Sequence, residues 1–530
     1  MNLRVCDRYL VLPVSYHAQS KNLSFFSDGR CVYDIDVNLD PIQPDTYQYL
    51  DLRHFLGQTL DIVVQPEMEL SLSLTESPPK ESLYHEKYRP QCHFSSERGW
   101  INDPNGLLWY QGKYHMFFQH NPAGSNWGNM HWGHAVSTDL LRWRQKEIAL
   151  FPDELGTIYS GSGFVDTRNA SGLKNGPDDP ILLFYTAAGS KSVLSAGQSF
   201  TQCLAYSIDG GKSFQKYVQN PIIPHIAGEN RDPKVVYAPA DDCYYLVLYL
   251  QDDAYALFIS DDLLHWKQTQ TIHLPGDDEC PDLYPLRLNG NGEEYWIFSG
   301  ASDRYLIGRL GGGRFEPCQP VQQLHFGNCS YAAQTFSHIP AADGRRLRIA
   351  WNQSSIPDSP FNGSMCTPLS MQLREINGER LLCAQPIREL ASRYQHTDDM
   401  TNQKVVPGQC WSLPLSGKSQ DITMKLSVGH SDSLTIALLG LALQIFPAEN
   451  RIECKGSAMP AYIRHGELTL RLITDVASVE IYTDQGEAFM AIAHLCDYTL
   501  NRLSIAGQKD DITILSLSSS TLSNVWSDTN

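Results

Sequence analysis

The chain of 530 residues exceeds the size that one hydrophobic core usually supports, so two or three domains are expected. Its formal net charge of −18 and its lack of any polybasic run exclude nucleic acid and an anionic membrane as partners, because both require clustered Lys and Arg. No apolar run in the sequence approaches the length of a membrane span. A small neutral substrate fits this composition better.

The cellular location is predicted from the first residues and from the cysteines. Asp7 and Arg8 stand where a secretory signal needs its apolar core. The 13 cysteines are an odd number without C-x-x-C pairs, which favours reduced thiols over a disulfide framework. We therefore expect a cytoplasmic protein.

The first 80 residues predict a small β domain. The run 33–39 alternates apolar and polar residues after a turn at Asp28 and Gly29, and the run 60–64 alternates in the same way. The stretch 77–80, S-P-P-K, is typical of a linker. The role of this domain stays open between packing, oligomerisation and sugar binding.

The middle of the chain repeats one turn pattern four times, at 137–143, 207–214, 260–266 and 308–315. In each copy a strand ends in a polar or glycine-rich turn, and the next strand opens with an aromatic residue. These aromatics are Trp143, Phe214, Trp266 and Phe315, at intervals of 71, 52 and 49 residues. Each interval suits one four-stranded propeller blade, so the motif is predicted to be structural.

A second β domain is predicted after about residue 400. Leu468, Leu470 and Leu472 alternate with polar residues there, and a D-Q-G turn follows at 484–486.

Three carboxylates stand in turns that contain proline. Asp103 lies in W-I-N-D-P-N-G at 100–106, Asp232 in R-D-P at 231–233, and Glu279 in E-C-P at 279–281. In the first run the Asn side chains can bond their own backbone, Pro fixes φ and Gly permits a positive φ. Such a turn aims its acid at a cleft, although a surface Asp is the commoner meaning of any one such string alone.

These three segments, in this order, resemble glycoside hydrolase family 32, the invertases, levanases, inulinases and fructan β-fructosidases. Segments with a weaker similarity to the family extend the resemblance over roughly 88–520; they lie at 117–122, 127–134, 159–162, 331–336 and 349–351. The resemblance implies an all-β fold with a five-bladed β-propeller at 88–390 and a C-terminal β-sandwich at 400–530. The β-sandwich-like domain at 1–80 is then an addition. The resemblance also implies cleavage of β-fructosides with retention of configuration.

By this resemblance Asp103 is the nucleophile, Glu279 is the acid/base, and Asp232 stabilises the oxocarbenium-like transition state together with Arg231. Retaining hydrolysis needs one ionised and one protonated carboxyl group, about 5–5.5 Å apart. The resemblance assigns substrate binding to Trp100, Asn102, Gln119, Trp127, Tyr159, Ser160, Arg231 and Trp351. Amides and hydroxyls suit sugar hydroxyls and aromatic faces suit C–H surfaces, but each residue could instead fill a turn or the core.

No cofactor and no metal are predicted. His120, His131 and His134 lie within fifteen residues, but no acid stands among them at ligand spacing, so structural histidines are expected. Cys280 could be a thiol nucleophile, but the resemblance makes it a neighbour that tunes the acid/base.

The predicted function is a retaining β-fructofuranosidase that hydrolyses terminal non-reducing β-D-fructosyl residues of sucrose and short fructo-oligosaccharides. The alternatives are a fructosyltransferase or a polymer-preferring exo-levanase or exo-inulinase on the same site and, more remotely, a non-catalytic sugar-binding propeller. His325 stands where the family commonly has an acid that holds the leaving-group sugar, which leaves the chain-length preference open. Whether the chain forms a homo-oligomer is also open.

Overall fold

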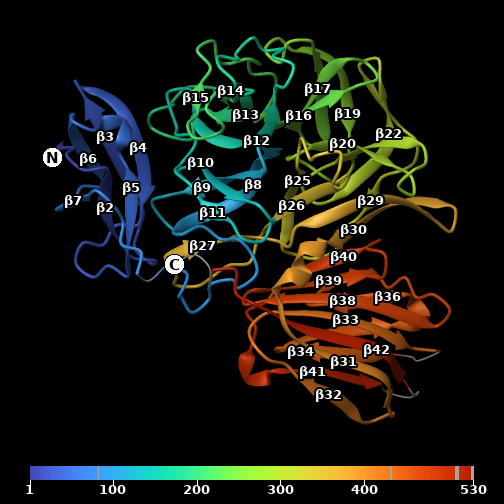
Figure 1. Cartoon of the computed structure of the whole chain (residues 1–530). Coiled ribbons are helices and arrows are strands. Elements are labelled where there is room, and N and C mark those ends of the chain that lie inside the picture. The colour runs from blue at the N-terminus through green and yellow to red at the C-terminus, as the bar shows by residue number, and fades with distance from the viewer. Residues whose placement is uncertain (82, 430–432, 508–511, 527–530) are drawn as a thin grey trace.

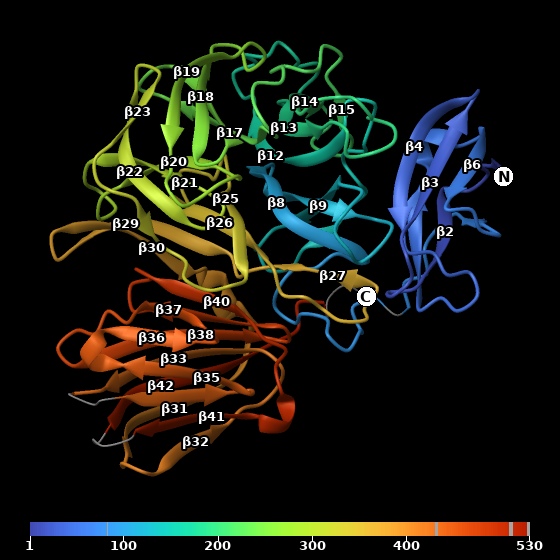
Figure 2. The ribbon, with the colours of Figure 1, turned by 180° about the vertical axis from the view of Figure 1, so that it is seen from behind.

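The structure is a computed structural model that describes residues 1–81, 83–429, 433–507 and 512–526. It is built almost entirely from β-strands (Figure 1). The N-terminal sheets and the C-terminal sheets pack against different sides of a central propeller (Figures 1 and 2). Among the described residues, no helix is long and apolar enough to cross a membrane.

Two antiparallel sheets form the N-terminal region, blue in Figure 1. Their strand orders are β1 (Asn2–Arg4), β6 (Thr59–Gln65), β3 (Lys21–Ser27) and β4 (Arg30–Val37), and β5 (Thr46–Asp51), β2 (Tyr9–Val14) and β7 (Ser73–Thr75), with the 3-10 helix η1 (Arg53–Phe55) after β5. Asp28 and Gly29 form the turn between β3 and β4 with φ of 49° and 76°. Leu23, Phe25 and Ile35 are fully buried in the core that the two sheets share.

Five sheets form the propeller. Their strands are β8 (Gly99–Tyr110), β9 (Lys113–Asn121), β10 (His131–Ser137) and β11 (Arg144–Gln145), with β27 (Phe361–Asn362) beside β8; β12 (Thr157–Val165), β13 (Ile181–Ala188), β14 (Thr201–Ser207) and β15 (Gln215–Lys216); β16 (Arg231–Ala238), β17 (Cys243–Gln251), β18 (Ala254–Ser260) and β19 (Lys267–His273); β20 (Asp282–Arg287), β21 (Glu294–Ser299), β22 (Arg304–Gly311) and β23 (Arg314–Pro317), with β24 (Gln322–Gln323) beside β22; and β25 (Ser330–Thr335), β26 (Arg346–Asn352), β29 (Leu369–Ile376) and β30 (Glu379–Pro386), with β28 (Ser364–Met365) beside β26. The first strand of each sheet contacts the first strand of the next, from β8 through β12, β16, β20 and β25 back to β8. The ring therefore closes with five blades.

The repeated turns join the third and fourth strands of the first four blades. In three copies a Ser hydroxyl and an Asp carboxylate accept backbone N–H groups of the turn; the pairs are Ser137 with Asp139, Ser207 with Asp209, and Ser260 with Asp262. Trp143 and Phe315, which follow the first and fourth turns, are buried in the core. The motif thus has the structural role that its sequence predicts.

The C-terminal sandwich consists of two six-stranded sheets, orange to red in Figure 1. Their strand orders are β31 (Tyr394–Val405), β42 (Ile512–Leu522), β33 (Gln420–Ser427), β38 (Glu467–Asp475), β39 (Ser478–Thr483) and β40 (Phe489–Ala493), and β32 (Cys410–Pro414), β41 (Arg502–Gly507), β34 (Leu434–Leu438), β35 (Leu441–Phe446), β36 (Arg451–Cys454) and β37 (Ser457–Pro460). Short 3-10 helices are η2 (Arg388–Arg393), η3 (Pro447–Glu449) and η4 (Tyr498–Leu500). Leu468, Leu470 and Leu472 are fully buried between the sheets, as their alternation predicts.

A buried carboxylate fixes the C-terminal sandwich to the segment that leads into the propeller. Asp475 of the sandwich accepts the backbone N–H groups of Gln91, Cys92 and His93. Burial opposes its ionisation, but the bond and charge of His93 and these N–H groups lower the pKa of Asp475 to about 2. Cys92, His93 and Asp475 lie close enough together to be metal ligands, but the Asp475 carboxylate already accepts the three backbone N–H groups that join the sandwich to residues 91–93.

Candidate active site

The three predicted catalytic carboxylates lie near the beginnings of three inner strands. Asp103 is in the first half of β8, Asp232 is the second residue of β16, and Glu279 lies just before β20. Because these strands belong to the closed ring of first strands, their beginnings meet at one end of the propeller axis. The fold therefore brings together acids that are far apart in sequence.

β-Bulges interrupt the inner strands at this end of the axis. The register shifts between Ile101 and Pro104, between Tyr159 and Gly161, between Arg231 and Lys234, and between Tyr331 and Gln334. A bulge leaves a residue out of the ladder and re-aims its side chain. Asp103, Ser160 and Asp232 are among the residues that the ladders skip, so the breaks in pairing turn these side chains toward one another.

The backbone is strained at the same place. Asp232, Glu279 and Cys280 have φ of 67°, 37° and 40°, in the left-handed region that non-glycine residues rarely adopt. Hydrogen bonds hold this conformation: the N–H of Cys280 donates to Asp232 Oδ2 at 3.0 Å, and the N–H of Asp232 donates to Thr186 Oγ1 at 3.0 Å. The strain is thus built into the turn that presents Glu279.

Three donors surround the Asp103 carboxylate. Ser160 Oγ donates to Asp103 Oδ2 at 2.6 Å, Asn102 Nδ2 donates to Oδ1 at 3.2 Å, and the Cys280 thiol lies 3.5 Å from Oδ2. Burial and the negative charge of Glu279 raise the pKa of Asp103, while these hydrogen bonds act in the opposite direction. The donors therefore hold the carboxylate in one orientation and favour its ionised form.

The thiol of Cys280 joins two of the acids. Its sulfur lies 3.4 Å from Asp232 Oδ2 and 3.5 Å from Asp103 Oδ2. Burial, followed by the charges of Asp232 and Asp103, holds the pKa of this thiol well above its usual range. A neutral thiol between two carboxylates acts as a donor, and such surroundings do not favour a thiolate nucleophile.

Arg231 and Tyr331 hold the Glu279 side chain from both sides. Arg231 donates to Glu279 Oε2 from Nη2 at 2.7 Å and from Nε at 3.1 Å, and the Tyr331 hydroxyl donates to Oε1. The Arg231 side chain is 18% exposed and its Nε lies 3.8 Å from Asp232 Oδ2. Arg231 therefore lies between two acids, although its short contacts are with Glu279.

Asp232 is the most deeply buried of the three acids, at 2% exposure. Burial raises its pKa, the Arg231 charge opposes that rise, and the charges of Glu279 and Asp103 add to it. The three acids thus form one coupled electrostatic unit.

Aromatic side chains flank the acids in two groups. The rings of Trp100 and Trp351 pack edge to face with their centroids 5.7 Å apart, and the centroids of Trp351 and Tyr331 are 6.4 Å apart. On another side, Trp127 meets Tyr159 at 6.1 Å. Trp127 is 57% exposed, which is unusual for so large an apolar side chain and suits a surface that a sugar covers.

The remaining predicted binding residue, Gln119, is buried beside β12. Its side-chain amide donates to the backbone oxygen of Ile158 at 2.8 Å. This bond supports the segment that carries Tyr159 and Ser160. The described bonds of Gln119 do not connect it to the three acids.

The three predicted structural histidines make local contacts. His120 Nδ1 contacts the backbone oxygen of Trp100, His131 Nε2 contacts the Tyr33 hydroxyl, and His134 Nε2 contacts His115 Nδ1. Burial lowers the pKa of His120 to about 4 and that of His131 to about 3. These neutral rings link strands within the first blade and link that blade to the N-terminal region.

His325 packs at the junction between the propeller and the C-terminal sandwich. It is 5% exposed, its Nε2 accepts the N–H groups of Gly327 and Ala491 at 3.1 Å, and its ring packs on Phe489. These contacts belong to the junction with the sandwich. The ring is sealed between two domains, so His325 gives no direct information on the leaving-group sugar, and the chain-length preference stays open.

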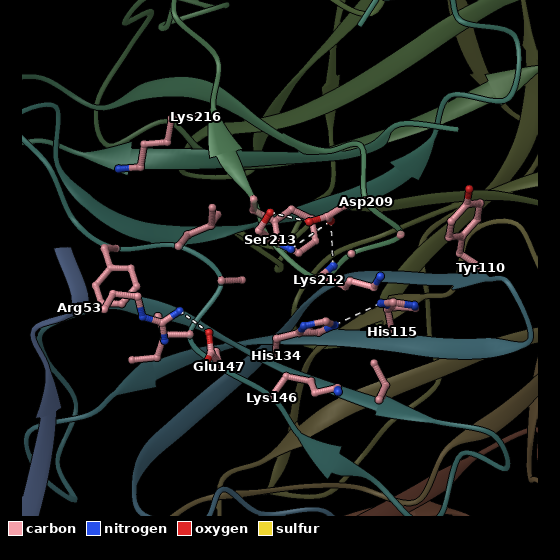
Figure 3. A pocket seen from close by; sticks show the side chains of 18 of the residues that line it. Arg53, Tyr110, His115, His134, Lys146, Glu147, Asp209, Lys212, Ser213 and Lys216 are labelled. Atoms are coloured by element: carbon pink, nitrogen blue, oxygen red, sulfur yellow. Dashed lines mark hydrogen bonds and ion pairs between the residues drawn. The ribbon is translucent and has the colours of Figure 1, made fainter. Parts of the chain in front are cut away.

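A cavity of about 930 Å³ lies elsewhere, where the first two blades meet the N-terminal region (Figure 3). Arg53 and Glu147 form an ion pair across it, and the stacked rings of His115 and His134 lie in its wall. None of the three predicted catalytic acids lines it. This cavity is therefore separate from the three acids.

Comparison with known proteins identifies the class of enzyme. The family profile of the glycosyl hydrolases family 32 N-terminal domain matches residues 93–386, more than half of the chain. The chain therefore belongs to glycoside hydrolase family 32, and it is a glycoside hydrolase of the β-fructofuranosidase and fructan hydrolase type.

Individual relatives agree with this assignment. A levanase of Bacillus subtilis (strain 168) is 28% identical over 523 residues, which span 89% of this chain and 76% of the relative. Invertase 1 of Saccharomyces cerevisiae is 29% identical over 456 residues, 79% of this chain and 82% of the relative. The crystal structure of an exo-inulinase from Aspergillus awamori superposes with a TM-score of 0.75 at 24% identity, covering 84% of this chain and 100% of that one. The propeller and sandwich fold is thus shared.

Two contacts of the site are missing from the sequence-based prediction. Tyr331 lies in one of the segments with a weaker similarity to the family, but nothing local predicts that its hydroxyl bonds Glu279. The sequence makes Cys280 a neighbour that tunes Glu279, but it does not predict that the thiol bridges Asp103 and Asp232. Both contacts depend on how separate blades meet.

Proposed function

We propose that the chain is a retaining β-fructofuranosidase that hydrolyses terminal non-reducing β-D-fructosyl residues of sucrose and short fructo-oligosaccharides. The observation that carries this proposal is the convergence of Asp103, Asp232 and Glu279 from three blades, joined by Cys280 and Arg231. A merely sugar-binding propeller has no need of three coupled acids.

In the first step an Asp103 oxygen attacks the anomeric carbon of the fructosyl unit, while Glu279 gives a proton to the departing glycosidic oxygen. The new bond joins fructose to Asp103 and releases the remaining sugar as an alcohol. Ser160 and Asn102 support this role because they fix the direction in which the carboxylate points.

In the second step Glu279 removes a proton from water, and the resulting hydroxide attacks the same carbon and frees Asp103. Asp232 bears charge beside the reacting ring in this proposal, and its hydrogen bond to a fructose hydroxyl strengthens as the ring flattens. Arg231 and Tyr331 position the Glu279 carboxyl group through both of its oxygens.

A fructosyltransferase is the nearest alternative, because it uses the same covalent intermediate and differs only in the acceptor. A polymer-preferring enzyme is the other alternative, since levanase and exo-inulinase stand among the similar proteins. Product analysis with sucrose, kestose, inulin and levan, each offered separately, tests the proposal. Free fructose as the first product, with higher kcat/KM for the short sugars, supports it; transfer products or a preference for polymer contradicts it.

We also propose that the enzyme acts on imported sugars in the cytoplasm. The observation in favour is that all 13 cysteines are free thiols and several are buried. Fractionation of cells that express the tagged native gene tests this location, and activity outside the cell would contradict it.

A further inference from the structure

A crevice of about 250 Å³ lies between the N-terminal sheets and the first two blades. Tyr16, Ser20, Asp36 and Asn38 line it from the N-terminal side. Asn126, Trp127, Tyr159 and Lys191 are among the residues that line it from the propeller side. Its volume falls just below the roughly 300–1,000 Å³ of pockets for drug-sized ligands, which suits a small neutral group such as a sugar unit.

The crevice adjoins the catalytic acids through two connections. Tyr159, in its wall, directly precedes Ser160, whose hydroxyl bonds Asp103. Lys191, in the same wall, pairs with Glu229 at 2.7 Å, and the backbone oxygen of Glu229 accepts a hydrogen bond from Arg231. The crevice and the acids therefore share this wall.

The N-terminal wall is held in a defined position. Asp34 accepts the N–H groups of Val193 and Leu194, both at 2.9 Å, from the loop that also carries Lys191. Asp36 exchanges two backbone bonds with the Asn129 side chain, at 2.8 and 2.6 Å. Pre-organised walls favour binding because little conformational entropy is lost when the ligand arrives.

The crevice offers polar groups that nothing in the described structure uses. In the part of the chain that the structure covers, no hydrogen bond or ion pair involves the side chains of Ser20, Asn38 or Asn126. Trp127 stands beside them with its ring largely exposed. Amides and a hydroxyl beside an exposed indole are the combination that binds sugars, with hydrogen bonds at the edges and apolar contact on the face.

We propose that the N-terminal domain completes the substrate cleft and that this crevice binds a sugar unit on the leaving-group side of the cleaved bond, beyond the first unit on that side. The inference rests on the proposed exo-hydrolysis, because an enzyme that removes the terminal unit leaves every other unit on that side. The domain then sets the chain-length preference.

A pair of bulky substitutions in one loop tests this site. Ser20→Trp fills the crevice, whereas Gln19→Trp adds the same ring at the neighbouring exposed residue, which does not line it. Ser20→Trp should lower kcat/KM for nystose, a tetrasaccharide, by about tenfold, the loss of one or two hydrogen bonds, and change that for sucrose by less than about twofold. Gln19→Trp should leave both values unchanged.

A second variant removes groups instead of adding bulk. Replacing Asn38 and Asn126 together by Ala should reduce the nystose-to-sucrose ratio of kcat/KM in the same direction, with an unchanged thermal unfolding profile. An unchanged ratio in both this variant and Ser20→Trp would overturn the proposal.

Calorimetric titration of nystose into Asp103→Asn separates this site from the catalytic proposal. Adding Ser20→Trp to that background should weaken nystose binding about tenfold, which is 1.4 kcal/mol. If the wild-type enzyme hydrolysed neither sugar, the proposed function would fail while this binding difference still supported the crevice. Equal affinities with and without Ser20→Trp would contradict the crevice, whatever the activity.

Discussion

Arg231 offers the sharpest test of how the acids depend on one another. Its guanidinium donates twice to Glu279 Oε2, at 2.7 and 3.1 Å, and its side chain is 18% exposed against 25% for Glu279. Breaking a fully buried pair costs about 3–5 kcal/mol, and partial exposure reduces this to about 2 kcal/mol here. Arg231→Gln should therefore lower kcat/KM for sucrose by roughly 30-fold.

The same substitution should move the pH profile in a defined direction. Burial raises the pKa of Asp232 and the Arg231 charge opposes that rise, so removing the guanidinium raises this pKa further. If ionised Asp232 is needed, activity falls earlier as the pH is lowered, and the acidic limb of kcat/KM moves to higher pH.

Initial rates of glucose release from sucrose, measured across the acidic and neutral range, check both effects. Arg231→Lys is the matched control, because it keeps the positive charge but loses the planar guanidinium that donates twice. Its acidic limb should move less than that of Arg231→Gln, and its rate should lie between those of the wild type and Arg231→Gln. A normal rate in Arg231→Gln, or an acidic limb that moves to lower pH, would refute the reasoning.

Four further predictions concern individual side chains and the expected independence from metal. Asp103→Asn should lose about 10³-fold or more in kcat with normal circular dichroism, since the pocket keeps its shape without the attacking charge; near-normal turnover would remove Asp103 from its role. Glu279→Gln should recover much of the first step on a fructoside with a good leaving group, because such a group needs no proton, and equal losses on natural and activated substrates would argue against an acid. Cys280→Ala should retain activity within about tenfold, because the thiol donates only weak hydrogen bonds, and abolished activity would require a different role for it. The wild-type enzyme should keep its activity after dialysis against EDTA, and a loss that one divalent ion restores would require metal chemistry.

Local sequence patterns predict much of the fold. The turn motifs at 137–143 and 207–214 carry their own Ser and Asp donors and acceptors, so they form the same turn wherever the blade stands. The alternation at 468–472 likewise predicts a half-buried strand without knowledge of its partner. The three acids stand in turns that contain proline, but their roles were predicted from the family resemblance of the three segments together, because each turn alone is ambiguous.

Contacts between blades were not recognisable in this way. The hydroxyl of Tyr331 reaches Glu279 only because β25 and β20 are neighbours in the closed ring. The contacts of His325 are a second example: its ring accepts the N–H of Ala491 in the sandwich, a residue that no local pattern links to it. Such contacts depend on how domains dock, which lies outside any short motif.

The most direct test of the central claim is to trap the covalent intermediate. Glu279→Gln should form it from an activated β-fructoside and discharge it slowly, because the general base for water is missing. Digestion and mass spectrometry should then find one fructosyl group, attached to Asp103, and none when Asp103→Asn is combined with Glu279→Gln. A fructosyl group on another residue, or release of inverted fructose without any adduct, would contradict the account.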